Sequence, residues 1–194
     1  MSGIAGPLAA WRRSEGLTQT DLARRLGVSQ QAVSYWERGK DVPGPAHMAQ
    51  IRSLLTQSGE LNIEKAFIRN QTTIRALFDC DDLRLLGVSA GFAALWPDFS
   101  RLIDVPLRND LVNESAALYG DASFRKAIMC KDIVAAAGVS ERHVRLDKDI
   151  AFKHRWFVRI RHFGARMVGD MIFEPCNADA PTGLEHLVTP EEWM

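Results

Sequence analysis

Cysteine is scarce in this sequence, which holds only Cys80, Cys130 and Cys176 in 194 residues. An odd number of cysteines at wide spacing argues against a framework of disulfides and against the close ligand spacing of a zinc site. Such usage is typical of a reducing compartment. We therefore predict a cytoplasmic protein without a metal site.

Long apolar runs and a leader segment are also missing. No apolar stretch approaches the roughly 20 residues that a helix needs to span a bilayer. The mildly apolar start has no basic opening segment, because Arg12 and Arg13 follow it rather than precede it. We therefore expect neither a membrane partner nor a secretory signal.

The chain lacks net charge, with 24 basic and 24 acidic side chains. Residues 1–60 carry a small basic excess and the remainder carries an equal acidic excess. Such a weak bias does not decide whether nucleic acid is a partner. The composition, 46% apolar and 25% charged, is that of a core-forming protein with one large domain or two small ones.

Catalytic sequence motifs are absent as well. The chain has no phosphate-binding glycine loop, no HExxH or GxSxG motif and no paired metal-ligand spacing. Its carboxylates are numerous but scattered along the sequence. We predict that the protein is not an enzyme.

The first 55 residues have the pattern of four short helices. Thr18 and Ser29 are N-cap residues for the second and third helices, and a glycine follows each of the first three. Pro45 suits the first turn of a fourth helix, which is expected to end at Leu55.

The third of these segments, VSQQAVSYWERGK, begins with two glutamines, Gln30 and Gln31. A helix built only for packing does not require such a pair. A glutamine amide offers one hydrogen-bond donor and one acceptor, which match N6 and N7 of adenine in the major groove. The segment therefore has the polar groups of a DNA-contacting helix.

The run LAAWRRSEGLTQTDLARRLGVSQQAVSYWERGK resembles the Xre/Cro-like repressor family, the fold of the phage lambda and 434 repressors, over 8–55. The resemblance implies an all-α, lambda-repressor-like helix-turn-helix domain at 1–58, whose 30–38 helix enters the major groove of double-stranded DNA. It also implies a core formed by Leu8, Trp11, Leu22, Leu26, Val33 and Trp36.

The same resemblance assigns roles to polar residues. Four are expected to contact bases: Gln30, Gln31, Ser34 and Tyr35. Four are expected to contact phosphates: Gln19, Ser29, Arg38 and Lys40. Arg12 and Glu37 are expected to join the first helix to the recognition helix. Since few cations face the DNA, we expect a homodimer on a palindromic operator, with half-sites about 34–36 Å apart.

The pattern changes after about residue 74. Two extended segments are predicted within 76–89, around an acidic turn, and a short helix within 91–99. A helical stretch is expected over 107–137. Alternation with a period of two over 155–163, followed after a glycine by a second such run to Pro175, predicts an antiparallel hairpin.

The run RALFDCDDLRLLGVSAGFAALWPDF and the later hairpin resemble a PAS domain, an α+β sensor fold with an antiparallel sheet. The resemblance implies a sensory or dimerisation domain at 74–176. The pattern before it predicts a linker helix at 59–73, and the acidic, proline- and glycine-bearing tail at 177–194 is predicted to be a loosely held extension. The linker helix is expected to pair with a second copy or to dock onto its own domain, through an apolar stripe of Ile63, Phe67 and Ile74.

No cofactor is required by the sequence. Haem in the PAS-like domain would need an axial ligand, for which the candidates are His143, His154, His162 and Cys130. A small apolar ligand and a tightly packed core are the alternatives. The basic run KHRWFVRIRH is explained either as a nucleic-acid strip or as the solvated face of a strand.

Two further alternatives stay open. The run KDIVAAAGVSERHVR, 131–145, repeats the pattern around Gly27 and is either a second helix-turn-helix or part of the PAS-like domain. The chain is either a transcriptional regulator or an antitoxin-like adaptor whose C-terminal domain binds a protein partner.

Overall fold

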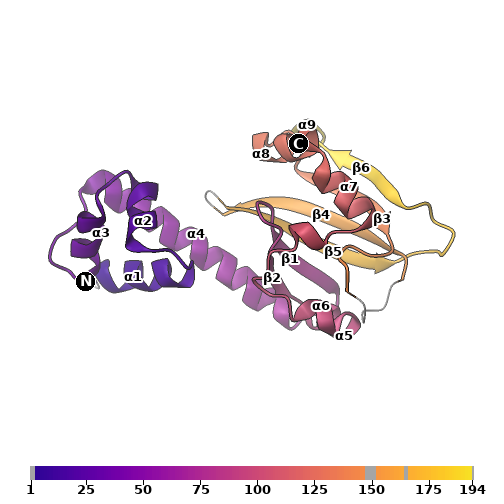
Figure 1. The fold of residues 1–194 in the computed structure, drawn as a ribbon, viewed down its shortest axis with the longest axis horizontal. Helices are drawn as coiled ribbons and strands as arrows, with labels where there is room; N and C mark the ends of the chain where they lie inside the picture. The colour runs from indigo at the N-terminus through magenta and orange to yellow at the C-terminus, as the bar shows by residue number, and fades with distance from the viewer. Residues whose placement is uncertain (1–2, 147–151, 164–165, 194) are drawn as a thin grey trace. The chain divides into compact units, whose positions relative to one another are not determined.

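The computed structural model describes residues 3–146, 152–163 and 166–193 (Figure 1). The chain divides into two compact units, Met1–Asn62 and Ile63–Met194, each with its own apolar core. Among the described residues, none of the helices combines the length and the apolar character needed to cross a membrane.

The N-terminal unit is helical. Its helices are α1 (Ala5–Ser14), α2 (Gln19–Leu26), α3 (Gln30–Glu37) and the first part of α4 (Pro45–Arg69). The side chain of Thr18 accepts a hydrogen bond from the amide of Asp21, whose carboxylate accepts one from the amide of Thr18, so α2 begins with a capping box. Gly27 ends α2 in the left-handed conformation, with a φ of 68°.

All six predicted core residues of this unit are buried. The most exposed of them, Trp11, has 7% of its surface accessible, and Ile51 of α4 completes the cluster. Burying each large apolar side chain stabilises the fold by roughly 1.5–3 kcal/mol. The predicted α2–turn–α3 arrangement and its core are therefore confirmed.

The fourth helix is longer than the sequence predicted. We expected it to end at Leu55 and a separate linker helix to follow over 59–73, but α4 is continuous for 25 residues and ends at Arg69. A glycine inside a helix, here Gly59, costs only about 1 kcal/mol. Burial of Leu61 and Ile68 on the following turns offsets that cost.

The C-terminal unit contains a six-stranded antiparallel sheet with the strand order β2-β1-β5-β4-β3-β6. The strands are β1 (Ile74–Asp79), β2 (Leu85–Val88), β3 (Ala135–Ser140), β4 (His154–Phe163), β5 (Arg166–Pro175) and β6 (Gly183–Val188). The predicted β1–β2 pair and the β4–β5 hairpin are both present. This confirms the expected fold class, an all-α helix-turn-helix domain followed by an α+β, PAS-like domain with an antiparallel sheet.

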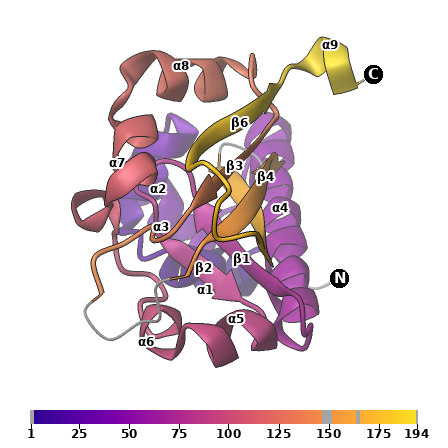
Figure 2. The ribbon, with the colours of Figure 1, turned by 90° about the vertical axis from the view of Figure 1, so that its right-hand side faces the viewer.

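Short helices accompany the sheet (Figure 2). They are α5 (Ala90–Leu95), α6 (Pro97–Ser100), the 3-10 helix η1 (Arg108–Asp110), α7 (Asn113–Gly120), α8 (Ala122–Cys130) and α9 (Pro190–Trp193). Phe92 of α5 packs edge-on against Phe99 and against Trp96, the C-cap residue of α5. Trp96 in turn packs edge-on against Phe173. With Trp156 of β4, these rings form the main core of the unit.

The other face of the sheet carries a cluster of ion pairs. Arg75 of β1 contacts Asp170 of β5 and Glu64 of α4, each at 2.7 Å. On β4, Arg161 contacts Glu64 at 2.7 Å and Arg159 contacts Asp170 at 3.2 Å. Because acidic partners compensate both arginines, the KHRWFVRIRH run is better explained as a strand face than as a nucleic-acid strip.

Of the two alternatives left open for 131–145, the structure excludes a second helix-turn-helix and places the segment in the PAS-like domain. β3 occupies Ala135–Ser140, and the helical stretch expected to reach Ala137 ends at Cys130. The small residues of this run, which resemble those of a helix-turn-helix, allow β3 to pack closely against its neighbours instead. A Cβ atom on Gly138 would lie 2.5 Å from the ring of Trp156, so the strand needs glycine there.

The tail is also more ordered than predicted. We expected 177–194 to be a loosely held extension, but β6 pairs with β3 along Gly183–Val188. Leu187 packs against the apolar core beneath the sheet. Pairing with a distant strand overrides the proline and glycine content that indicated a loose tail.

Candidate nucleic-acid interface

Helix α3 presents one polar face to solvent. The side chain of Ser29 caps the helix by accepting a hydrogen bond from the amide of Ala32. Val33 and Trp36 are buried on the opposite face. This periodicity leaves Gln30 and Gln31 exposed on the first turn.

A hydrogen-bonded series of four polar side chains from three helices extends from Gln30 to the protein interior. The guanidinium of Arg12 donates two hydrogen bonds to the carboxylate of Glu37, at 2.6 and 3.1 Å. Glu37 also accepts a bond from Nε2 of Gln19 at 2.9 Å. Oε1 of Gln19 in turn accepts a bond from Nε2 of Gln30 at 2.7 Å. We call Arg12, Glu37, Gln19 and Gln30 the charged chain.

The ion pair within the charged chain perturbs both partners. Burial alone would raise the pKa of the Glu37 carboxyl, but the hydrogen bonds from Arg12 and Gln19 outweigh it and hold that pKa below its ordinary value. The hydrogen bond to Glu37 raises the pKa of Arg12. The pair therefore stays ionised at neutral pH and fixes α1 against α3, as the sequence led us to expect.

The remaining predicted base contacts form hydrogen bonds on the helix surface, Gln31 with Tyr35 and Ser34 with Arg38. Nε2 of Gln31 donates to the hydroxyl of Tyr35 at 2.8 Å. Arg38 donates to the carbonyl and the hydroxyl of Ser34, at 3.0 and 2.7 Å, and lies over the ring of Tyr35. Since these bonds are solvent-exposed, each is weak enough for DNA to replace it.

The predicted phosphate contacts fall into two groups. Ser29, Arg38 and Lys40 are exposed at the two ends of α3. Because Ser29 uses its oxygen as an acceptor in the cap, its hydroxyl proton is left for a phosphate oxygen. Gln19 is half-buried within the charged chain, so it supports Gln30 in addition to its predicted role. Contact of any of these residues with DNA stays a prediction.

The bond between Gln19 and Gln30 was not predicted from the sequence. Both residues occupy the first position of a helix, directly after the N-cap residues Thr18 and Ser29. The recurrence of a hydroxyl residue followed by glutamine, eleven residues apart, was the available signal. It places the two amides at neighbouring helix N-termini.

This arrangement defines a helix-turn-helix domain, and comparison with known families identifies the same kind of domain. Residues 8–56 match the family model described as Helix-turn-helix. The match supports a DNA-binding regulator. No curated protein matches the chain.

Two solved structures resemble this chain over a larger part of its length than the helix-turn-helix family model does. One, with 11% identity and a TM-score of 0.40, is a PAS domain from a two-component sensor histidine kinase, and the match covers 60% of this chain and 96% of that one. Another, with 13% identity and a TM-score of 0.38, is the phage VqmA-DPO complex, and the match covers 60% of this chain and 52% of that one.

Proposed function

We propose that the protein is a cytoplasmic, sequence-specific transcriptional regulator, a homodimer that inserts α3 into the major groove at each half of a palindromic operator. The observation that carries this proposal is the charged chain, which holds the amide of Gln30 at the exposed start of α3. The C-terminal unit serves as its sensory or dimerisation domain.

The hydrogen-bonding capacity of Gln30 supports a contact with adenine. Its Nε2 has two protons, of which the bond to Gln19 uses one. One amide proton and the oxygen Oε1 remain. These are the donor and the acceptor that a bidentate contact with N7 and N6 of adenine requires.

An exposed apolar pair on α4 supports the homodimer. Ile63 and Phe67 lie one helical turn apart, and 71% and 63% of their surfaces are exposed. Ile74, the third member of the predicted stripe, packs against the core of the C-terminal unit instead. Since Ile63 and Phe67 do not dock onto their own unit, a second copy of the chain is the partner we propose for them.

Genome-wide binding by the wild type and by a Gln30→Ala/Gln31→Ala variant tests the DNA-contacting role. Each good bidentate contact contributes roughly 1–3 kcal/mol of base discrimination, so we expect the variant to lose the sequence motif that the wild type selects. Gln50, an exposed glutamine of α4, provides the matched control, and Gln50→Ala should retain the motif. An unchanged motif in the double variant would refute the assignment of Gln30 and Gln31.

The oligomeric state tests the other half of the proposal. Light scattering on the full chain should give the mass of a dimer, which Phe67→Glu converts to a monomer, whereas Asn62→Glu, an exposed polar position of the same helix, has no effect. A monomeric wild type contradicts the dimer. Co-purification of a stoichiometric second protein, lost in Phe67→Glu, would favour the antitoxin-like adaptor instead.

A further inference from the structure

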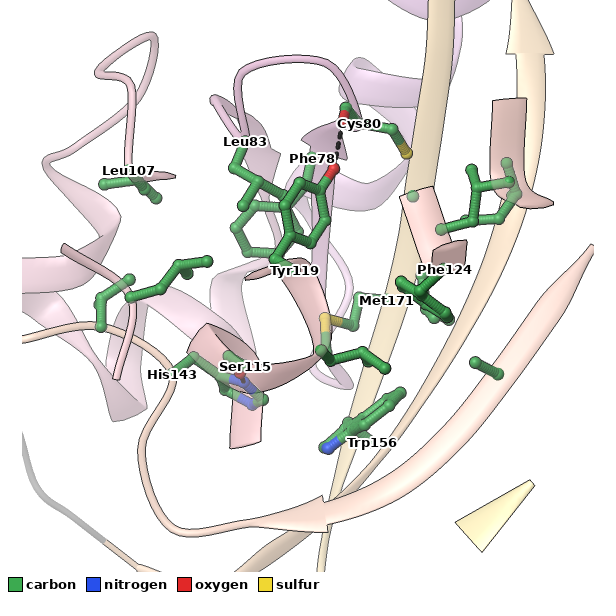
Figure 3. A pocket seen from close by; sticks show the side chains of 18 of the residues that line it. Phe78, Cys80, Leu83, Leu107, Ser115, Tyr119, Phe124, His143, Trp156 and Met171 are labelled. Atoms are coloured by element: carbon green, nitrogen blue, oxygen red, sulfur yellow. Dashed lines mark hydrogen bonds between the residues drawn. The ribbon is translucent and has the colours of Figure 1, made fainter. Parts of the chain in front are cut away.

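The C-terminal unit contains a partly open cavity of about 120 Å³ (Figure 3). Its wall is formed by β1, β3, β4 and β5 on the sheet side and by α6, α7 and α8 on the other. Aliphatic and aromatic side chains make up most of this wall, among them Phe78, Leu107, Phe124, Trp156 and Met171. The cavity is therefore predominantly apolar.

The volume limits what the cavity can hold. A dry apolar cavity of about 150 Å³ in another protein binds benzene. A volume of about 120 Å³ accordingly fits one small ring with the modest adjustment that side-chain rotation provides. Larger fused-ring molecules and haem exceed this volume.

One end of the wall is polar, where Ser115 of α7 lies beside His143 (Figure 3). Oγ of Ser115 is 2.6 Å from Nδ1 of His143, and Nε2 of His143 is 2.8 Å from Nε2 of His154. Nδ1 of His154 is 2.8 Å from the carbonyl oxygen of Phe152. We call Ser115, His143, His154 and this carbonyl the neutral chain.

The direction of each hydrogen bond in the neutral chain follows from its last member. A carbonyl only accepts, so Nδ1 of His154 carries a proton, and in the neutral ring Nε2 is then an acceptor. Nε2 of His143 must donate to it, which leaves Nδ1 of His143 as an acceptor. The hydroxyl of Ser115 therefore donates inward to His143 and keeps only its lone pairs for the cavity.

Burial keeps both rings in the neutral form that this assignment needs. It lowers the pKa of His143 to about 3, and it also lowers the pKa of His154. All four ring nitrogens have hydrogen-bond partners, so neither histidine offers a free lone pair to haem iron in this arrangement.

The second hydroxyl on the wall is oriented in the same way. Tyr119 donates its proton to the carbonyl oxygen of Cys80. The thiol of Cys80 is desolvated, which raises its pKa to about 12, so it stays uncharged. The oxygens of Ser115 and Tyr119 thus give the cavity hydrogen-bond acceptors, in a wall of otherwise apolar character.

We propose that this cavity binds a neutral, single-ring, largely apolar molecule through one hydrogen-bond donor, which the hydroxyl oxygen of Ser115 accepts. An anion would meet lone pairs at Ser115 and Tyr119, and a cation would lose its hydration in an apolar site. This inference rests on the proposed function in one respect: it identifies the bound molecule as the signal of the regulator.

Calorimetry on the full chain with three probes tests the binding. Phenol carries a donor, whereas toluene and anisole have a similar shape without one. One hydrogen bond of about 1.4 kcal/mol corresponds to a tenfold difference in affinity, so the wild type should bind phenol about tenfold more tightly than either other probe. This comparison needs no variant.

Two serine variants locate the acceptor. Ser115→Ala should remove the preference for phenol and make toluene, the more apolar probe, the tighter binder. Ser123→Ala, at an exposed position of α8, should behave as the wild type does. Failure of all three probes to bind, as in a cavity that holds only water, would overturn the proposal. A preference for phenol over toluene that is the same in Ser115→Ala as in the wild type would also overturn it.

The experiments can refute the ligand proposal and the proposed DNA-binding function independently of each other. Probe binding is measured without DNA, and the Gln30/Gln31 experiment is measured without probe. A phenol concentration that just saturates the wild type should then change the affinity of the wild type for its operator at least threefold and change that of Ser115→Ala, which binds phenol more weakly, by less. An unaltered operator affinity in a protein that binds phenol would overturn the role of the molecule as the signal.

Discussion

The two units of this protein each contain a chain of four polar groups, but the two chains differ in charge and in where they end. The charged chain contains an ion pair, Arg12 with Glu37, and ends at Gln30 on the exposed start of α3. The neutral chain contains two buried imidazoles and ends at Ser115, on the wall of a partly open cavity.

This difference follows from burial. A partly buried carboxylate keeps its charge when a guanidinium and an amide donate to it, as at Glu37. A buried imidazole remains neutral because desolvation disfavours its charged form, as at His143. A charged chain suits an interface with polyanionic DNA, and a neutral chain suits a small uncharged molecule.

The largest effect is expected from breaking the ion pair. Arg12→Ala leaves the carboxylate of Glu37, whose side chain is 6% exposed, without its guanidinium, and should destabilise the N-terminal unit by about 3 kcal/mol. Its exposed neighbour supplies the control, since Arg13→Ala should cost less than about 0.5 kcal/mol. Hydrogen exchange of the α1–α3 amides measures both variants. Equal exchange in the two would show that the charged chain adds no stability.

Acid should destabilise the C-terminal unit before the N-terminal one. The unfolded chain binds a proton at the ordinary histidine pKa of 6.5, whereas folded His143 resists protonation down to about pH 3. The free energy of unfolding therefore falls as the pH drops below 6.5, by about 2 kcal/mol for this residue at pH 5. Hydrogen exchange of the β3 and β4 amides, compared at pH 7 and at pH 5, provides the measurement.

Two histidine variants and the carboxylate of Glu37 provide the controls for this pH comparison. His143→Phe should reduce the loss, and His186→Gln, at an exposed position of β6, should not. Because the pKa of Glu37 lies below its ordinary 4.5, the stability that Glu37 contributes is present above pH 4.5 and is lost as the pH falls below it. Simultaneous acid unfolding of both units near pH 6 would contradict this distinction.

Removing the support of Gln30 should have a smaller effect than removing Gln30 itself. Gln19→Ala deletes one hydrogen bond to the Gln30 amide, and we expect base discrimination to weaken by about 1 kcal/mol. Thr20→Ala, at the next and exposed position, is the matched control. Fluorescence anisotropy on the operator and on single-base variants compares the two. Unchanged discrimination in Gln19→Ala would restrict Gln19 to a phosphate contact or to none.

The smallest effect is expected at Lys40. If this exposed side chain contacts a phosphate, Lys40→Ala should weaken binding equally on all sequences and reduce the slope of log K against log salt by about 0.9. Lys126→Ala, in the C-terminal unit, should leave the slope unchanged. A sequence-dependent loss in Lys40→Ala would instead indicate a base contact.

Local signals account for what the sequence predicted correctly. Thr18, Ser29 and Gly27 determine the ends of α2 and α3, and apolar spacing identifies Val33 and Trp36 as core. The β4–β5 hairpin follows from alternation within adjacent runs. Each of these features depends on residues close in sequence.

Long-range contacts account for what the sequence did not predict. β6 depends on pairing with β3, more than forty residues earlier in the chain. His143 and His154 were candidate haem ligands, but their partners, Ser115 and the Phe152 carbonyl, could not be identified by spacing. No short-range pattern reports that a serine and a histidine 28 residues apart form a hydrogen bond.

The most direct measurement is a crystal structure of the protein bound to an operator recovered from the genome-wide experiment. We predict Oε1 and Nε2 of Gln30 within about 3 Å of N6 and N7 of an adenine, with the bond to Gln19 still in place. A complex in which α3 lies outside the major groove, or in which Gln30 contacts only its own protein, would contradict the proposed function.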